Sequence, residues 1–259
     1  MKHYRQFIVQ IQRAIFNSTA KPGFDSKTIS EIILEYLSKE NTSREDEQEF
    51  GRFLEGKKIK HLIHFTHVDN IKNILKFGLI PRVYLKEKII KLELNPIFSD
   101  SQRFDKREEV NCLSISFPNY KMFYTKSKHN QDNWAVILFD LNVIRKHICE
   151  FTANNLASAN TTGIKGIEGI KKMFFGSQVR EKLRLPDFYT TDPQAEVLES
   201  SVIPPSWIKE IHLKSGNLSN KLIELNESEN IKILVNNQFF SARKDYKYWQ
   251  KTGVLESIS

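Results

Sequence analysis

The sequence predicts an α+β fold with an N-terminal helical extension. Apolar residues recur at helical spacing over the first 50 or so positions, a strand, helix, strand unit follows from Ile59, and several short strand-like runs with irregular links come after it. At 259 residues and 40% hydrophobic content, the chain can bury a full-sized core, and its length favours one large domain with an appendage. We expect the extension to span residues 1–56 and the main domain residues 57–259.

Three helices are expected in the extension. Residues 3–16 and 28–37 both carry apolar side chains at helical spacing, and Lys21-Pro22-Gly23 breaks the chain between them, so they predict a helical hairpin. The polar stretch 41–47 offers several N-caps for a third helix, which ends near Gly56.

The main domain opens with a strand at Ile59–Phe65, an amphipathic helix at Asp69–Phe77 closed by Gly78, and an extended segment at 79–81. Residues 152–194 form a long polar excursion with little strand signal, and loops of that length inside a domain are usually functional or disordered. Further strands are expected at 112–117, 134–140, 195–199, 208–213 and 231–235, and a short helix at 143–148.

Charge and cysteine usage narrow the functional class. Lysine and arginine number 39 against 31 acidic residues, and the resulting net charge of +8 favours a polyanionic partner, although an ordinary basic protein has the same balance. Cys112 and Cys149 lie in apolar runs without metal-ligand spacing, which indicates free thiols in a reducing compartment. No apolar run reaches the roughly 18–20 residues of a membrane span, so we expect a cytoplasmic protein without membrane contact.

The first candidate motif is the histidine-rich run from His61 to Asn70. Strand alternation places His64 and Thr66 on one face and Phe65 on the other. The three-residue spacing of the histidines sends successive members to opposite faces, and no carboxylate falls at a zinc-like interval, so we expect no metal. Taken alone, His64 is better explained as a satisfied histidine at a sheet edge, and only a partner motif elsewhere in the chain favours a functional role.

A second motif lies around Gln194-Ala-Glu196. Alternation places Gln194 and Glu196 on the same face of the expected strand. Cleavage of an N-glycosidic bond such as that of NAD⁺ passes through an oxocarbenium-like state, which a nearby carboxylate stabilises. The amide of Gln194 can hold an acceptor through both a donor and an acceptor atom. Gln-x-Glu by itself is a weak signal.

A third candidate is Arg103, in the segment Asp100-Ser-Gln-Arg-Phe-Asp105. A guanidinium group suits bidentate contact with a diphosphate. The alternative is a solvated loop arginine that pairs with Asp100 or Asp105.

Together these motifs resemble the DarT family, bacterial toxins that ADP-ribosylate DNA bases. The resemblance covers roughly residues 59–215 and keeps the order of the family: the run from His64 to Leu79, Arg103, the Ser114–Met122 segment, and Gln194-Ala-Glu196-Val-Leu. It implies an ADP-ribosyltransferase-like split mixed sheet with flanking helices and with NAD⁺, the consumed co-substrate, in the cleft. Residues 57–259 would then be the catalytic domain.

The resemblance also implies roles for individual residues. Glu196 and Arg103 would be catalytic, Glu196 as the glutamate required for transfer and Arg103 as the arginine that contacts NAD⁺. The remaining NAD⁺-binding residues would be His64, Thr66, Asn70, Gly78 and Leu79.

On the acceptor side, the resemblance implies a substrate-recognition loop at about 165–194. Basic residues there can contact phosphates and aromatic residues can stack on an unpaired base, although a solvated basic helix face has the same composition. A base in a duplex must first be unstacked, which favours single-stranded DNA. The residues predicted to contact DNA are Tyr120, Met122, Lys172, Arg180, Tyr189 and Gln194.

The sequence therefore predicts an NAD-dependent ADP-ribosyltransferase that modifies a base in single-stranded DNA. By resemblance it would be the toxin of a toxin-antitoxin pair, with a macrodomain antitoxin as partner. The alternatives are an enzyme of the same fold that acts on RNA or protein, and a non-catalytic basic module that binds nucleic acid. A metal-dependent nuclease is a further alternative, but the sequence does not contain the clustered carboxylates that such an enzyme uses to bind its metal.

Overall fold

The computed structural model describes residues 42–86, 96–98, 107–157, 161–214 and 231–252. The helical hairpin expected over 3–16 and 28–37 lies outside these residues, and so does Arg103. In the described part no helix has the length and the apolar character needed to cross a membrane.

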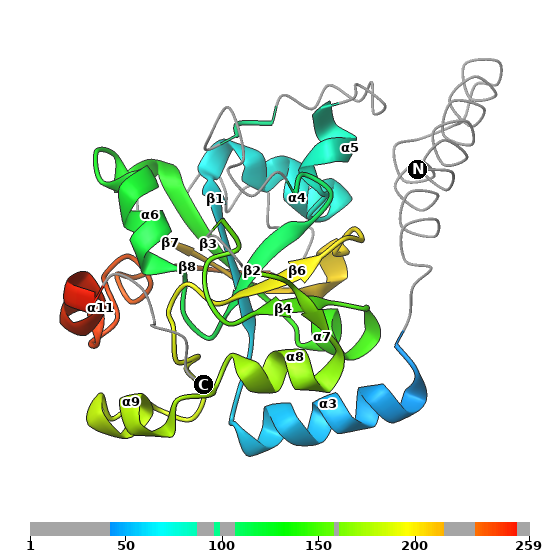
Figure 1. The fold of residues 1–259 in the computed structure, drawn as a ribbon. Helices are drawn as coiled ribbons and strands as arrows, with labels where there is room; N and C mark the ends of the chain where they lie inside the picture. The colour runs from blue at the N-terminus through cyan, green and yellow to red at the C-terminus, as the bar shows by residue number, and fades with distance from the viewer. Residues whose placement is uncertain (1–41, 87–95, 99–106, 158–160, 215–230, 253–259) are drawn as a thin grey trace, which may run out of the picture.

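An eight-stranded mixed sheet forms the centre of the described chain (Figure 1). All neighbouring strands are antiparallel except β7 and β8, which are parallel, and the strand order is β5-β4-β6-β2-β1-β3-β7-β8. The α+β class and the mixed sheet are thus confirmed. The strands are β1 Leu62–His67, β2 Asn111–Ile115, β3 Trp134–Phe139, β4 Glu150–Thr152, β5 Ile164–Lys165, β6 Glu196–Glu199, β7 Ile208–Leu213 and β8 Lys232–Val235.

The sheet splits between β1 and β2. Along its whole length β1 pairs with β3, from Leu62 opposite Phe139 to His67 opposite Trp134. With β2 it pairs only at Leu62 and Ile63, because β2 continues instead alongside β6. The second half of β1 therefore diverges from β2 and opens a cleft between the two strands.

Strand alternation divides the core into two clusters. Ile63 packs with Val136 and Leu138 on one face of the sheet, together with Phe123 of α6 and the aromatic pair Phe239 and Phe240. Leu62 belongs to the larger cluster on the opposite face, which also receives side chains from α3, α4, α7 and α8. Because their side chains point the same way as Leu62, His64 and Thr66 share this second face.

The helices cover both faces and the ends of the sheet. In Figure 1, α3 and α8 run side by side at the bottom of the view and α4 and α5 lie at its top, and α3, α4 and α8 all pack into the larger core cluster, whereas α6 packs on the opposite face. The helices are α3 Arg44–Gly56, α4 Ile71–Phe77, α5 Arg82–Lys86, α6 Tyr120–Ser127, α7 Asn142–Lys146, α8 Gly166–Lys172, α9 Ser177–Lys182 and α11 Tyr246–Thr252, with 3-10 turns η1 Val68–Asn70, η2 Gln131–Asn133 and η3 Pro205–Trp207.

Helix α3 begins and ends as the sequence predicts. The Ser43 hydroxyl accepts a hydrogen bond of 3.1 Å from the Asp46 amide, which caps the helix, and acidic residues fill the first turn. Its apolar face places Phe50 and Leu54 in the larger core cluster. This helix therefore shares the core of the main domain, and a domain boundary at residue 57 stays a prediction.

Candidate active site

A cavity of about 520 Å³ opens where β1 and β2 diverge. Its wall is built from β1, α4, β2, α6 and β6 and from the short segment 96–98. This volume falls within the range of small-ligand sites, roughly 300–1,000 Å³. Eight of the predicted site residues line it: His64, Thr66, Asn70, Gly78, Leu79, Met122, Gln194 and Glu196.

His64 occupies the point at which β1 leaves β2. Its Nδ1 lies 3.0 Å from the carbonyl oxygen of Cys112 on β2. A carbonyl oxygen only accepts hydrogen bonds, so Nδ1 is the donor in this contact and carries the proton. The split in the sheet thus fixes the orientation of this imidazole.

Asn70 joins two parts of the cavity wall. Its side-chain NH₂ donates to Thr66 Oγ1 at 2.9 Å and to the Ile97 carbonyl at 2.9 Å, and its Oδ1 accepts from the Ile97 amide at 2.8 Å. The side chain therefore fastens the segment 96–98 to β1 through η1. In the sequence, Arg103 follows this segment by five residues and lies outside the described residues.

Gly78 and Leu79 join the end of α4 to the segment that follows β6. Gly78 ends α4 with φ of +83°, and Leu79 exchanges two backbone hydrogen bonds with Ile203, at 2.9 and 3.0 Å. The Leu79 carbonyl also accepts from Asn111 Nδ2 at 3.0 Å. Both residues line the cavity while they hold α4 in place, and a role in contacting NAD⁺ stays a prediction.

Glu196 contributes a carboxylate to the cavity wall from the start of β6. It is only 5% exposed, its Oε2 accepts from the Leu156 amide at 3.0 Å, and its own backbone amide donates to Thr152 Oγ1 at 3.2 Å. Pairing of β6 with β4 on one side and β2 on the other fixes its backbone. A carboxylate held in this way can face developing positive charge without prior rearrangement.

Gln194 enters the cavity from a tight turn before β6. The Asp192 carboxylate accepts a hydrogen bond from the backbone N–H of Gln194 at 2.7 Å, and the Asp192 carbonyl accepts one from the backbone N–H of Ala195 at 3.2 Å. Burial raises the pKa of Asp192, an effect that the hydrogen bond from Gln194 and the positive charges of Lys121 and Arg243 partly oppose. The turn thus aims an amide and a carboxylate, two residues apart, into the same cavity.

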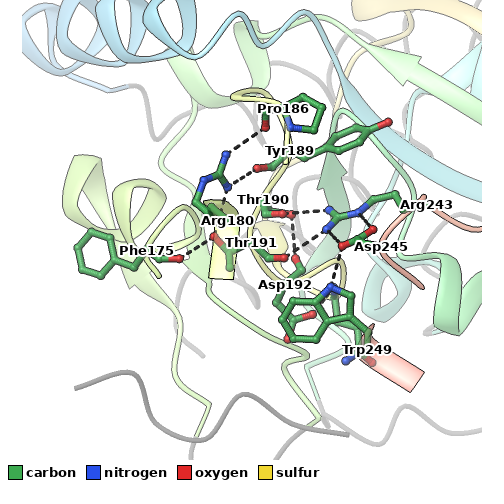
Figure 2. A network of polar contacts seen from close by, with 11 residues as sticks. Phe175, Arg180, Pro186, Tyr189, Thr190, Thr191, Asp192, Arg243, Asp245 and Trp249 are labelled. Carbon is green, nitrogen blue, oxygen red and sulfur yellow. Dashed lines mark hydrogen bonds and ion pairs between the residues drawn. The ribbon is translucent and has the colours of Figure 1, made fainter. Parts of the chain in front are cut away.

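Four predicted acceptor-side residues do not line this cavity. Tyr120 is buried, and burial, followed by the negative charge of Asp245, raises the pKa of its hydroxyl. Lys172 lies at the end of α8. Arg180 donates to the carbonyls of Tyr189 and Pro186 (Figure 2). Tyr189 packs edge-on against Phe117. Contact of these four residues with DNA stays a prediction.

The sequence reading missed three cations of the cavity wall, Arg82, Lys121 and Lys126. Arg82 is 8% exposed, its guanidinium lies 4.3 Å from the centroid of the Phe98 ring, and Nε lies 3.7 Å from Glu108 Oε1. Both lysines lie on α6, Lys121 within the Ser114–Met122 segment and Lys126 four residues after it. Their proximity to that motif was the available signal, but the lysine-rich composition of the chain hides it.

The titratable side chains of the cavity do not form a metal site. Within the described ranges, no three His, Cys, Asp or Glu side chains come together in a way that could hold a metal ion. What the cavity combines is a fixed imidazole, a fixed carboxylate, an amide and several cations. This set suits a ligand with a diphosphate and an amide-bearing ring.

Comparison with known proteins decides the family. A family model described as "ssDNA thymidine ADP-ribosyltransferase, DarT" matches residues 63–241. The chain belongs to the DarT family. The match begins in β1 and ends after β8, so it contains the whole of the cavity wall described above.

Solved DarT structures share the fold. Thermosipho africanus DarTG in complex with ADP-ribose aligns with a TM-score of 0.56 and 17% identity over 70% of this chain, which corresponds to 51% of that protein. Thermus sp. 2.9 DarT in complex with NAD⁺ aligns with a TM-score of 0.50 and 14% identity over 70% of this chain and 98% of that one. The same Thermus protein in complex with ADP-ribosylated single-stranded DNA gives a TM-score of 0.50, 14% identity, and coverage of 70% and 96%.

This DarT chain therefore spans about half the length of the Thermosipho protein and nearly all of the Thermus protein. A comparison with curated proteins found no match. The predicted family and fold are confirmed.

Proposed function

We propose that this chain transfers ADP-ribose from NAD⁺ to the thymine base of single-stranded DNA, with Glu196 and Arg103 as catalytic residues. The observation that carries the proposal is the shared cavity, in which the imidazole of β1 and the carboxylate of β6 face the same space in a chain of the DarT family. The solved neighbours that hold NAD⁺ and ADP-ribosylated single-stranded DNA support this choice of donor and acceptor.

The cavity wall suits both ends of NAD⁺. The imidazole of His64 can form a hydrogen bond with the nicotinamide amide, and Thr66 lies beside it on the same face. Arg82, Lys121 and Lys126 supply positive charge for the diphosphate. Arg103 is the further cation that we assign to the diphosphate, and Asn70 supports the segment that leads to it.

The transfer step breaks the bond between the ribose C1′ and the nicotinamide nitrogen and forms a bond from C1′ to the base. The bonding electrons leave with nicotinamide, which departs as a neutral molecule, and positive charge develops on the ribose. Glu196 stabilises that charge. In thymine, N1 is bonded to the deoxyribose and no exocyclic amine exists, so N3 is the available ring nitrogen. Its proton passes to Glu196 as the new bond forms.

The acceptor enters from the side of Gln194. The amide of Gln194 can pair with the carbonyl and imide groups of thymine, and Met122 provides an apolar wall. Lys172, Arg180 and Tyr189, on the loop before β6, are proposed to contact the flanking nucleotides. Single strands are favoured because a paired base must first leave its stack.

In the cell we propose a cytoplasmic toxin with a macrodomain antitoxin that removes the modification. The name DarTG of the Thermosipho neighbour supports a toxin-antitoxin setting. Uncontrolled modification of DNA bases would block replication, so an enzyme of this kind needs a counteracting partner.

Mass spectrometry of oligonucleotides tests the proposal directly. The protein is incubated with NAD⁺ and four single-stranded DNA oligonucleotides, each of which lacks one base, together with an RNA oligonucleotide and a carrier protein. We expect the mass of one ADP-ribosyl group on every DNA that contains thymidine and none on the DNA that lacks it. Label on RNA or protein in place of DNA would move the assignment to another acceptor.

Replacement of the carboxylate tests the role of Glu196. Glu196→Gln keeps the size and can still accept from the Leu156 amide, but it removes the charge, so we expect a loss of transfer on the order of a thousandfold with little change in stability. Glu55→Gln, at an exposed position of α3 outside the proposed DNA-binding loop, is the matched control and should leave transfer unchanged. Equal activity of the two variants would contradict the proposed role of Glu196.

A further inference from the structure

Arg243 is a buried arginine that lies beyond the residues matched by the family model. Its side chain is 2% exposed, and it precedes α11 by three residues. The Asp245 carboxylate accepts two hydrogen bonds from it, one of them from Nε at 2.9 Å, and also accepts from Trp249 Nε1 at 2.7 Å (Figure 2). The guanidinium group is thus locked in one orientation by its own segment.

The opposite edge of this guanidinium holds the loop that leads to the active site. Nη1 donates to the Thr190 carbonyl at 3.0 Å and Nη2 to the Thr191 carbonyl at 3.2 Å. The group also lies 4.9 Å from the centroid of the Tyr189 ring. One side chain therefore fixes two successive carbonyls and the ring before them.

Arg180 holds the same loop from the side of α9. Its Nη1 donates to the Tyr189 carbonyl at 2.7 Å and to Thr191 Oγ1 at 3.2 Å, and its Nη2 donates to the Pro186 carbonyl at 3.0 Å. Thr191 in turn donates from its hydroxyl to the Phe175 carbonyl at 2.6 Å. Figure 2 shows the loop between the two guanidinium groups.

The end of this loop is the turn that carries Gln194 and Glu196. Thr191 is followed directly by Asp192, whose carboxylate accepts a hydrogen bond from the backbone N–H of Gln194. Strand β6 then starts at Glu196. A displacement of about 1 Å at reacting groups can cost on the order of a hundredfold in rate. Backbone motion at Thr190 and Thr191 would therefore displace the side chains of Gln194 and Glu196, which follow Thr191 within five residues.

We propose that residues 243–249 form a clamp that positions the acceptor side of the active site, with Arg243 as its positioning residue. Burial of a guanidinium and a carboxylate brings little stability compared with apolar side chains of the same volume, so a buried pair of this kind is best explained by the geometry that it imposes. The clamp rests on the proposed function, in which Gln194 and Glu196 face the DNA acceptor.

Two variants separate positioning from folding. Arg243→Lys keeps the charge, but a single ammonium group cannot bind the Asp245 carboxylate and both carbonyls at once. The double change Arg243→Met and Asp245→Asn removes both buried charges while it keeps side-chain volume, so the fold should tolerate it. Arg145→Met is the matched control, because Arg145 pairs with Glu47 on α3, away from the loop.

The kinetic readout is kcat for DNA modification compared with the Kd for NAD⁺. We expect both Arg243 variants to lose about a hundredfold in kcat, to change the Kd for NAD⁺ less than twofold, and to keep the melting temperature of the control. Parallel losses of kcat, NAD⁺ affinity and melting temperature would mean that the segment has a structural role only, and wild-type kcat in both variants would also overturn the clamp.

Hydrogen exchange tests whether Arg243 holds the loop, and it does so without any DNA acceptor. In both Arg243 variants we expect amides of the peptide 186–196 to exchange at least tenfold faster, while β1 and β3 stay as protected as in the control. Unchanged exchange there would refute the clamp. If the wild-type protein modifies no DNA, the proposed function fails on that result alone, and the exchange data still test whether Arg243 holds the loop.

Discussion

Gly78 ends α4 in a backbone conformation, with positive φ, that residues with a Cβ atom rarely adopt. Its φ is +83°, and an added Cβ would lie 2.3 Å from the Ile203 carbonyl oxygen and 3.0 Å from Val202 Cγ1. Neither the backbone oxygen nor the bridge between Leu79 and Ile203 can yield without loss of hydrogen bonds. We expect Gly78→Ala to lower the free energy of unfolding by about 2 kcal/mol or more, measured by urea denaturation.

Gly56, the last residue of α3, provides the control for this substitution. No heavy atom lies within 4 Å of a Cβ added there, and its φ is outside the left-handed region. Alanine reduces the freedom of the unfolded chain, so Gly56→Ala should raise the free energy of unfolding by up to about 1 kcal/mol. Equal effects of the two substitutions would refute the close contact at Gly78.

Asp192 should make stability depend on pH. Burial raises its pKa above the ordinary value of 3.8, so between 3.8 and the raised value the folded protein binds more protons than the unfolded chain. Its contribution to stability is therefore complete below pH 3.8 and is lost as the pH rises through the folded-state pKa. We expect the difference in unfolding free energy between wild type and Asp192→Asn to fall with rising pH over that window. A flat or rising difference would contradict this sign.

Among the elements, those with a full period of pattern could be predicted and the short ones could not. The runs that became β1, β3 and β7 each extend over six residues, enough for alternation or a continuous apolar stretch to show. β4 has three residues and β5 two, and they exist because β6 offers an edge on which β4 pairs, and β4 in turn offers one to β5. The residues of β4 and β5 themselves do not indicate that a distant strand will be available for pairing.

The long excursion at 152–194 shows the same limit. It contains α8 and α9 as well as β5, although its polar composition predicted a loop with little strand signal. α8 has only seven residues and buries Gly169 and Ile170, so contact with β4 and α3 stabilises it more than intrinsic propensity does. Regular structure that depends on tertiary packing is missed when each segment is read alone.

In the whole molecule, the active site depends on one topological event, the divergence of β1 from β2. His64 and Glu196 are 132 positions apart in the chain. They face one cavity because β1, which carries His64, diverges from β2, and β2 pairs with β6, which carries Glu196. Residue chemistry alone could nominate each side chain, but strand order is set by non-local pairing and was available only through the family resemblance. Arg243 was missed because nothing in its local sequence indicates which carbonyls it binds.

The two cysteines report on the cavity and on the core separately. Cys112, half-buried on β2, lines the cavity, so we expect iodoacetamide to modify it in the folded protein and saturating NAD⁺ to slow that reaction severalfold. Cys149 is buried, and burial together with the Glu199 carboxylate raises its pKa, so its thiol should react only as the protein unfolds. Peptide mass spectrometry over time measures both rates, and Cys112→Ser should leave the slow phase alone. Failure of NAD⁺ to protect Cys112 would contradict the placement of the donor between β1 and β2, whereas fast reaction of Cys149 in the folded protein would contradict its burial in the core.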